Sequence, residues 1–126
     1  MNIESLREYC LSLPYATEDC AFGPEYLLFR VEDKIFGCIC LDKPDIFVVK
    51  CDATLALELR ERHPEIEGAW HWNKRYWNQV SLIGTLTDEF ILRLIDHSYT
   101  QVVKKLPRKT VVAHPLLATI SDPFIP

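Results

Sequence analysis

Three short apolar segments constrain the fold of this chain more than any other feature. They are residues 26–31 (YLLFRV), 35–41 (IFGCICL) and 46–50 (IFVVK), and each is rich in β-branched or aromatic residues. Polar turns separate them, first at residues 32–34 and then at residues 42–45. The spacing therefore predicts a meander of three antiparallel strands.

Segments with helical periodicity lie before and after this meander. The pattern of apolar residues predicts helices over residues 3–13, 53–62 and 88–106. Each has a side chain placed to cap its start, namely Asn2, Asp52, and Thr85 or Thr87. A proline follows each predicted helix and marks its end: Pro14, Pro64 and Pro107. The apolar stripe of the third helix consists of Ile91, Leu94, Ile95, Val102 and Leu106, with Ser98 in line.

The segments AWHW (69–72) and YWNQVSL (76–82) predict a second hairpin with its turn at residues 73–75. With a two-residue loop, strand parity separates its side chains into two faces. One predicted face carries Trp70, Trp72, Arg75 and Trp77, and the other carries His71, Asn73, Tyr76, Asn78 and Val80. An exposed tryptophan face beside Lys74 and Arg75 would suit base stacking and phosphate contact. Alternatively, the tryptophans pack against the third helix or the C-terminal segment.

The predicted fold class is α+β. The elements follow the order α-β-β-β-α-β-β-α, a two-layer sandwich with the helices on one face of an antiparallel sheet. At 126 residues the chain is long enough for one domain. We assign residues 1–109 to that domain and residues 110–126, which contain Pro115, Pro123 and Pro126, to a C-terminal tail. The tail is expected to pack on this domain or on a neighbour.

The charge of the chain is unevenly distributed. It carries 14 basic and 18 acidic residues, a formal net charge of −4, which repels nucleic acid and anionic membranes at long range. A cluster without acidic residues nevertheless follows the third helix and could contact phosphate locally. An alternative is that these cations simply favour the carboxyl end of a helix dipole. The cluster consists of Lys104, Lys105, Arg108 and Lys109.

The five cysteines do not form a disulfide pattern or a metal-binding pattern. Their number is odd, none forms CxxC, and the N-terminus MNIESLREYC lacks the basic and apolar start of a signal peptide. We therefore expect a cytoplasmic protein with mostly buried, reduced cysteines. Cys38 and Cys40 share one face of their strand, but a zinc site with His63 or His71 would need about four ligands at characteristic spacings. No metal or cofactor is predicted.

The chain contains no motif that indicates catalysis or a membrane span. GxSxG, HExxH, GxGxxG and GxxxxGK[ST] do not occur, and no run of 18 apolar residues is present. We expect a protein without enzymatic activity and without a membrane partner. A small enzyme or ligand binder that uses His71, Tyr76 and a cysteine is an alternative, and it requires these groups to converge in one pocket.

Three segments resemble the MmcQ/YjbR family of small bacterial proteins: AFGPEYLLFRVEDKIFGCI, HWNKRYWNQVSL and LIDHSYTQVVKKLPRK. Their order and spacing extend the resemblance from about Ile3 to Lys109. The resemblance implies a two-layer α/β fold like that of type III secretion chaperones and of CyaY. It also implies a double-wing arrangement and DNA binding. This chain has Tyr76-Trp77 where family members often have His-Trp, and residues from Thr110 onward lie outside the resemblance.

Two functions follow as hypotheses. In the first, Lys74 and Arg75 contact the phosphates of double-stranded DNA from a wing, Trp77 supports or stacks, and Lys104, Lys105, Arg108 and Lys109 add charge. In the second, the protein is a chaperone-like interaction module. An apolar sheet face or the tail would then bind a protein partner or a second copy.

Overall fold

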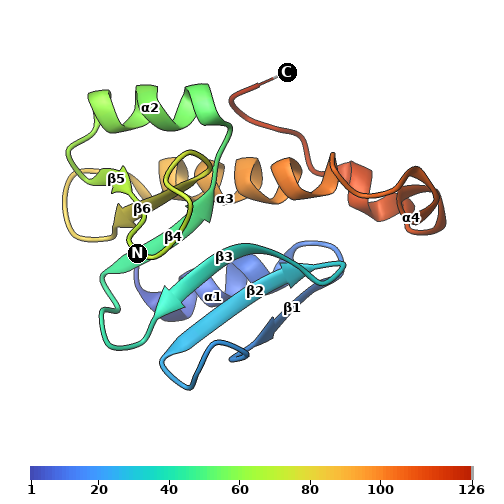
Figure 1. The fold of residues 1–126 in the computed structure, drawn as a ribbon, viewed down its shortest axis with the longest axis horizontal. Coiled ribbons are helices and arrows are strands. Elements are labelled where there is room, and N and C mark those ends of the chain that lie inside the picture. The colour runs from blue at the N-terminus through green and yellow to red at the C-terminus, as the bar shows by residue number, and fades with distance from the viewer. Residues whose placement is uncertain (126) are drawn as a thin grey trace.

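The three predicted strands are adjacent in the computed structural model, which describes residues 1–125. They are β2 (Tyr26–Val31), β3 (Lys34–Cys40) and β4 (Ile46–Lys50), and each pairs antiparallel with the next. The remaining strands are β1 (Ala16–Asp19), β5 (Ile66–Gly68) and β6 (Trp77–Ser81). Together they form a six-stranded antiparallel sheet in the order β1-β2-β3-β4-β6-β5 (Figure 1).

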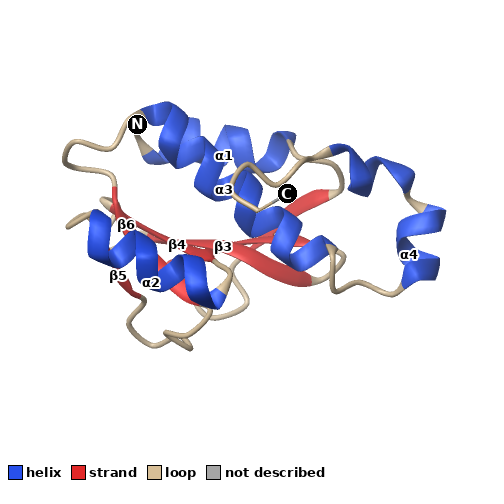
Figure 2. Ribbon diagram, turned by 90° about the horizontal axis from the view of Figure 1, so that it is seen from above, coloured by secondary structure: helices blue, strands red, loops and turns tan. Residues whose placement is uncertain are grey.

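The helices confirm the predicted α+β class. They are α1 (Ile3–Ser12), α2 (Ala53–Arg62) and α3 (Asp88–Val103). Asn2, Asp52 and Thr87 cap them, each accepting a hydrogen bond from a backbone N–H of the first turn. Figure 2 shows α1 and α3 together on one side of the strands, with α2 at the β5 end of the sheet. Side chains from all three helices enter one core on this face, which we call the inner face.

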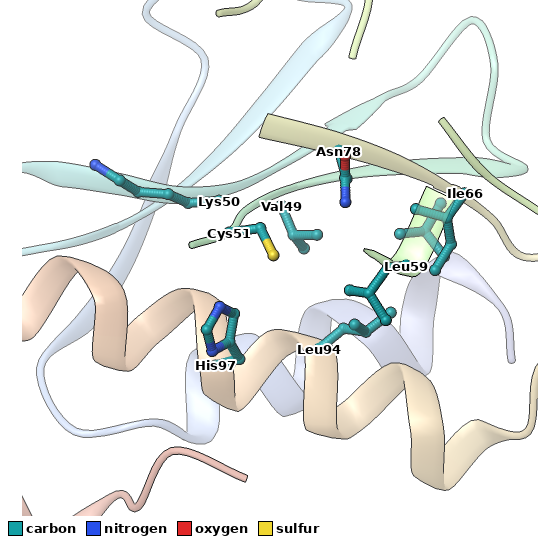
Figure 3. Close-up of a pocket in the computed structure, with 9 residues that line it drawn as sticks. Val49, Lys50, Cys51, Leu59, Ile66, Asn78, Leu94 and His97 are labelled. Atoms are coloured by element: carbon teal, nitrogen blue, oxygen red, sulfur yellow. The ribbon is translucent and has the colours of Figure 1, made fainter. Parts of the chain in front are cut away.

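Alternation along the strands fills this core. Phe29, Phe47 and Val80 point inward from β2, β4 and β6 and are 0–1% exposed. Between β4, β6, α2 and α3 the side chains, among them Cys51 and His97, leave no room for a water molecule (Figure 3). This internal space is therefore part of the packed core and is not a ligand site.

Strand β1 was not predicted, because its sequence, ATED, lacks an apolar pattern. It is an edge strand that pairs only with β2, so few of its side chains need to be apolar. Two ion pairs attach it to neighbouring elements: Asp19 to Arg30 of β2 at 2.6 Å, and Glu18 to Arg7 of α1.

The predicted second hairpin is wrong in its first strand. Residues 66–68 form β5 and pair with residues 78–80, whereas residues 69–76 form a loop without strand structure. In β6 the predicted parity holds, because Asn78 and Val80 face the core and Trp77 faces away from it. The alternative that the tryptophans pack against α3 or the tail is also wrong. Trp72 and Trp77 pack on the opposite, outer face of the sheet, against Leu28, Cys38, Val48 and Ala69.

The third helix is shorter than predicted, and the C-terminal segment is partly helical. Helix α3 ends at Val103, and the chain continues into α4 (Arg108–Ala113) and the short 3-10 helix η1 (Pro115–Thr119). Figure 1 shows α4 beyond the end of α3, away from the strands. The chain then returns, and Leu117 is buried in the main core. The C-terminal segment thus packs on its own chain.

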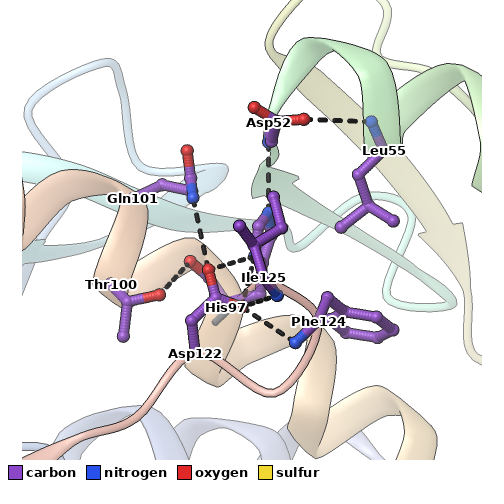
Figure 4. Close-up of polar contacts among 8 residues, drawn as sticks. All are labelled: Asp52, Leu55, His97, Thr100, Gln101, Asp122, Phe124 and Ile125. Atoms are coloured by element: carbon purple, nitrogen blue, oxygen red, sulfur yellow. Dashed lines mark hydrogen bonds and ion pairs between the residues drawn. The ribbon is translucent and has the colours of Figure 1, made fainter.

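A buried histidine attaches this segment to the helices. His97 of α3 is 1% exposed, and its Nε2 accepts a hydrogen bond from the backbone N–H of Asp52 at 3.1 Å. Its Nδ1–H therefore donates to the carboxylate of Asp122, at 2.9 Å (Figure 4). The same carboxylate accepts the backbone N–H groups of Phe124 and Ile125. Helix α2, helix α3 and the C-terminal segment meet at this network.

No helix in the described part of the chain, residues 1–125, is long and apolar enough to cross a membrane.

Candidate nucleic-acid interface

The outer face of the sheet is covered only in part, by the loop of residues 69–76, which we call the aromatic loop. Ala69 is fully buried against the sheet, and Trp72 packs beside Trp77 of β6 with 4.5 Å between ring centroids. The backbone N–H of Trp70 donates to Gln79 Oε1 at 3.0 Å. His71 has φ of 67°, a left-handed conformation that lets the chain turn between Trp70 and Trp72. The aromatic loop therefore lies on the sheet, and it does not project as a wing.

Arg60 of α2 holds the other end of this loop. Its guanidinium donates to the carbonyl oxygens of Lys74 and Trp77, and its Nε donates to Asn78 Oδ1 at 2.6 Å. Asn78 is 1% exposed, and its side-chain amide donates in turn to the carbonyl of Ala56. A charged donor shared among several acceptors gives strong, directional hydrogen bonds. Arg60 thus fixes the position of the backbone that carries Arg75 and Tyr76.

Tyr76 brings together two basic groups that are far apart in the sequence. The Arg75 guanidinium lies 5.5 Å from the centre of the Tyr76 ring, and Lys105 Nζ, at the end of α3, lies 5.4 Å from it. Lys50 Nζ lies 5.9 Å from the neighbouring Trp77 ring. These distances are typical of cation–π contacts. We define the basic face as Lys50, Arg75 and Lys105 around the two rings, together with Lys34 and Lys104, whose charges act on Lys50.

Three lysines of the basic face, Lys105, Lys104 and Lys34, lie close enough to Lys50 to repel its charge. Burial, and after it the charges of Lys105, Lys104 and Lys34, lower the pKa of Lys50 below its ordinary value. Within the described residues, none of the five basic side chains of this face has a carboxylate within 4.0 Å. Such a surface concentrates positive potential on a chain whose net charge is negative.

The structure places the predicted site residues in three groups. Arg75, Trp77, Lys104 and Lys105 lie at the basic face. Lys74 lies apart, with its Nζ 5.8 Å from the Trp70 ring. Arg108 and Lys109 are exposed on the first turn of α4, beyond the end of α3. Sequence reasoning missed Lys34 and Lys50, although the position of Lys50 at the end of an apolar strand was visible in the sequence.

A groove lies on the outer face of the sheet. The Trp72–Trp77 pair lies between this groove and Lys50. Its volume is about 920 Å³. The floor includes Tyr26, Cys38, Cys40 and Val48, and the aromatic loop forms one wall. Burial raises the pKa of the Cys38 thiol to about 12, which keeps it protonated and unreactive at neutral pH.

The groups considered for catalysis and metal binding converge only in part. His71 and the two cysteines Cys38 and Cys40 line the groove, whereas Tyr76 is not among the lining residues and lies at the basic face. Among residues 1–125, no three His, Cys, Asp or Glu side chains are grouped so that they could hold a metal ion. All five cysteines are free: Cys10, Cys38 and Cys51 are buried, Cys40 is half-buried and Cys20 is exposed.

A family model described as YjbR matches residues 11–101 of this chain. The chain belongs to the YjbR family. The matched residues include the aromatic loop and most of α3, and they end before Lys104. The YjbR resemblance noted in the sequence is therefore confirmed.

Relatives and solved structures agree with this assignment. Uncharacterized protein YjbR of Escherichia coli strain K12 is 32% identical over 110 residues, which cover 86% of this chain and 93% of that protein. Uncharacterized protein YbdF of Escherichia coli O157:H7 is 27% identical over 107 residues, with coverage of 84% and 88%. A Pseudomonas syringae protein superimposes with a TM-score of 0.68 at 27% identity, over 80% of this chain and 98% of its own.

The C-terminal segment has a counterpart in a further structure. The Deinococcus radiodurans protein DR2400, with a domain described as DUF419, superimposes with a TM-score of 0.84 at 29% identity. The superposition covers 96% of this chain and 90% of that protein. Since so few residues remain uncovered, most of residues 110–126 must match a segment of DR2400.

Proposed function

We propose that this YjbR-family protein binds nucleic acid through the basic face, as a cytoplasmic protein without catalytic activity of its own. The observation that carries the proposal is the meeting of Arg75 and Lys105 on the ring of Tyr76, with Lys50 beside them on Trp77. The loop and the end of α3 were separate candidates in the sequence. In the structure they contribute to a single surface.

The electrostatics of the basic face favour a polyanion. Lys105, Lys104 and Lys34 each repel Lys50, and within residues 1–125 no carboxylate lies within 4.0 Å of these lysines, so a phosphate that binds here would relieve like-charge repulsion. Phosphate binding also releases counterions from the nucleic acid, which is the main source of affinity in such complexes. Tyr76 and Trp77, both half-buried, supply aromatic surface next to these cations.

The predicted wing is replaced in this proposal by a surface contact. Entry into the major groove of a duplex requires a helix or a two-stranded ribbon that projects from the protein. The aromatic loop packs on the sheet through Ala69 and Trp72, so it supplies no such ribbon. The basic face would instead contact the phosphate backbone.

A protein partner or a second copy of the chain is the second candidate. Exposed apolar side chains at or near the groove favour it, namely Phe22, Leu41 and Trp70, which are 44–67% exposed. Such an interface would depend little on salt, whereas phosphate contacts depend on it strongly.

Fluorescence anisotropy of a labelled oligonucleotide tests the nucleic-acid proposal. The protein would be titrated at about 50 and about 200 mM salt, because phosphate contacts weaken steeply over this range. We expect the Kd to rise with salt and to rise further in an Arg75→Ala/Lys105→Ala variant. Arg62→Ala is the matched control, because Arg62 is an exposed cation on α2 away from the basic face. Absence of binding at low salt, or equal affinity of the double variant and the control, would contradict the proposal.

A further inference from the structure

The groove on the outer face of the sheet adjoins the basic face at the Trp72–Trp77 pair. Trp72 lines the groove, its ring centroid is 4.5 Å from that of Trp77, and Trp77 is in turn 5.9 Å from Lys50 Nζ. A flexible polymeric ligand that crosses this boundary would place its charged groups on the basic face and its neighbouring groups in the groove. The groove volume of about 920 Å³ is within the range of pockets that hold small planar molecules.

Two aromatic side chains at the groove are more exposed than packing alone would require. Trp70 is 67% exposed and Phe22 is 56% exposed. Both belong to loops, and Phe22 lies 6.1 Å from Trp72 between ring centroids. Large apolar side chains gathered in this way on a surface indicate a binding site. Flat aromatic rings are suited to stacking against nucleobases, and the Lys74 ammonium, 5.8 Å from the centre of the Trp70 ring, adds a cation beside that ring.

The polar groups of the groove differ in charge from those of the basic face. Glu67 and Asp42 line the groove together with Lys43, His71 and the side-chain amides of Gln79 and Asn73, so its charge is mixed, whereas the basic face is positive throughout. Carboxylate oxygens accept hydrogen bonds from the amino groups of bases, whereas the amide oxygens of Gln79 and Asn73 already accept the backbone N–H groups of Trp70 and Arg75. Carboxylates repel phosphate, however. The charge distribution thus favours bases in the groove and phosphates on the basic face.

We propose that the groove binds the unpaired bases of a single-stranded nucleic acid, whose phosphates lie along the basic face. This inference rests on the proposed function and specifies the form of nucleic acid. In a duplex the bases are paired and stacked inside, so they cannot stack on Trp70 or Phe22. The protein then binds single strands more tightly than duplexes of the same sequence.

Paired titrations of a single strand and its duplex test this inference. Trp70→Ala should weaken single-strand binding by about 5- to 100-fold, the effect of losing the stacking of one base, and leave duplex binding nearly unchanged. Trp70→Phe, which keeps a ring, should restore much of the loss. Since Trp70 is mostly exposed, neither change should unfold the protein, and urea unfolding of each variant checks this.

Photocrosslinking locates the base directly. A single strand that carries 5-iodouracil should crosslink to the tryptic peptide of residues 63–74, which contains Trp70 and Trp72. The variant Arg75→Ala/Lys105→Ala should lower the yield by weakening binding without moving the crosslink.

The outcomes separate the two proposals. If neither single strands nor duplexes bind at low salt, both the proposed function and the groove assignment are wrong. If both forms bind equally, Trp70→Ala changes nothing and the crosslink maps outside residues 63–74, the groove assignment alone is wrong.

Discussion

The indole rings of Trp72 and Trp77 lie 4.5 Å apart between centroids, and they connect the groove to the basic face. Trp77 belongs to β6 and is adjacent to Lys50, whereas Trp72 belongs to the aromatic loop and lines the groove. The contact between the two rings places the groove next to the basic face.

Arg60 is predicted to position the aromatic loop without contacting a ligand. Arg60→Lys retains the charge but loses the planar fork that reaches Lys74, Trp77 and Asn78. The loss of these hydrogen bonds should lower the free energy of unfolding by about 1–3 kcal/mol and weaken oligonucleotide binding. Urea unfolding and near-UV circular dichroism, which reports tryptophan packing, measure the effect. Arg62→Lys, on an exposed position of the same helix, should change neither, and an equal effect of both variants would exclude this role of Arg60.

Asp122 is predicted to make stability depend on pH in the acidic range. Burial alone would raise the pKa of Asp122, but hydrogen bonds from His97 and from the backbone N–H groups of Phe124 and Ile125 outweigh burial and lower it. A carboxyl group whose pKa is lowered by folding contributes stability that is fully present above its unfolded pKa. This stability is lost as the pH falls through the lower, folded pKa.

Comparison with Asp122→Ala tests this prediction. At neutral pH the variant should be about 1–3 kcal/mol less stable, because the buried Nδ1–H of His97 loses its acceptor. The difference in urea midpoint should shrink as the wild-type carboxylate is protonated in acid. A difference that stays constant from neutral pH into the acidic range would show that the carboxylate charge is not involved.

Most of the fold could be predicted from the sequence because its core elements have clear apolar periodicity. The meander of β2, β3 and β4 and the starts of α1, α2 and α3 follow from spacing and capping residues. The edge strands β1 and β5 could not be predicted, because they are short and only partly buried. Trp70 and Trp72 suggested a strand because tryptophan has a high β-propensity. Residues 69–76 instead form a loop, in which Ala69 and Trp72 pack on the outer face of the sheet.

The candidate site was predictable only in pieces. The basic residues at 75 and at 104–105 were visible in the sequence, but nothing in their spacing indicated that both approach Tyr76. Lys50 and Lys34 join the basic face through antiparallel pairing of β3 with β4, and the groove depends on how the aromatic loop folds back. These relationships are tertiary, so local patterns in one sequence do not contain them.

Gly37 is predicted to be required for packing on the inner face. A Cβ at this position would lie 2.8 Å from Cζ of the buried Phe47 ring, so Gly37→Ala should lower the free energy of unfolding by about 1–3 kcal/mol. At Gly68 an added Cβ would meet only the flexible stem of the exposed Lys74, at 3.1 Å. Gly68→Ala should therefore lower the free energy of unfolding by less than Gly37→Ala does. Urea unfolding of both variants compares them, and equal losses would contradict this packing argument.

The cysteines are predicted to react with iodoacetamide in an order set by burial. Burial raises the pKa of the Cys38 and Cys51 thiols to about 12. It also raises the pKa of the Cys10 thiol. Cys20 is exposed and should be alkylated first in the native protein. Mass spectrometry of tryptic peptides over time gives the order. Rapid native labelling of Cys38 would mean that the aromatic loop opens readily.

The salt dependence of oligonucleotide binding tests the central claim most directly. If Lys50, Arg75, Lys104 and Lys105 each neutralise one phosphate, a plot of log K against log salt for a single strand should have a slope of about −3. The Arg75→Ala/Lys105→Ala variant should reduce the slope by about 1.4, whereas Arg62→Ala should leave it unchanged. A slope near zero, or one that the double variant does not alter, would contradict the assignment of the basic face as a nucleic-acid interface.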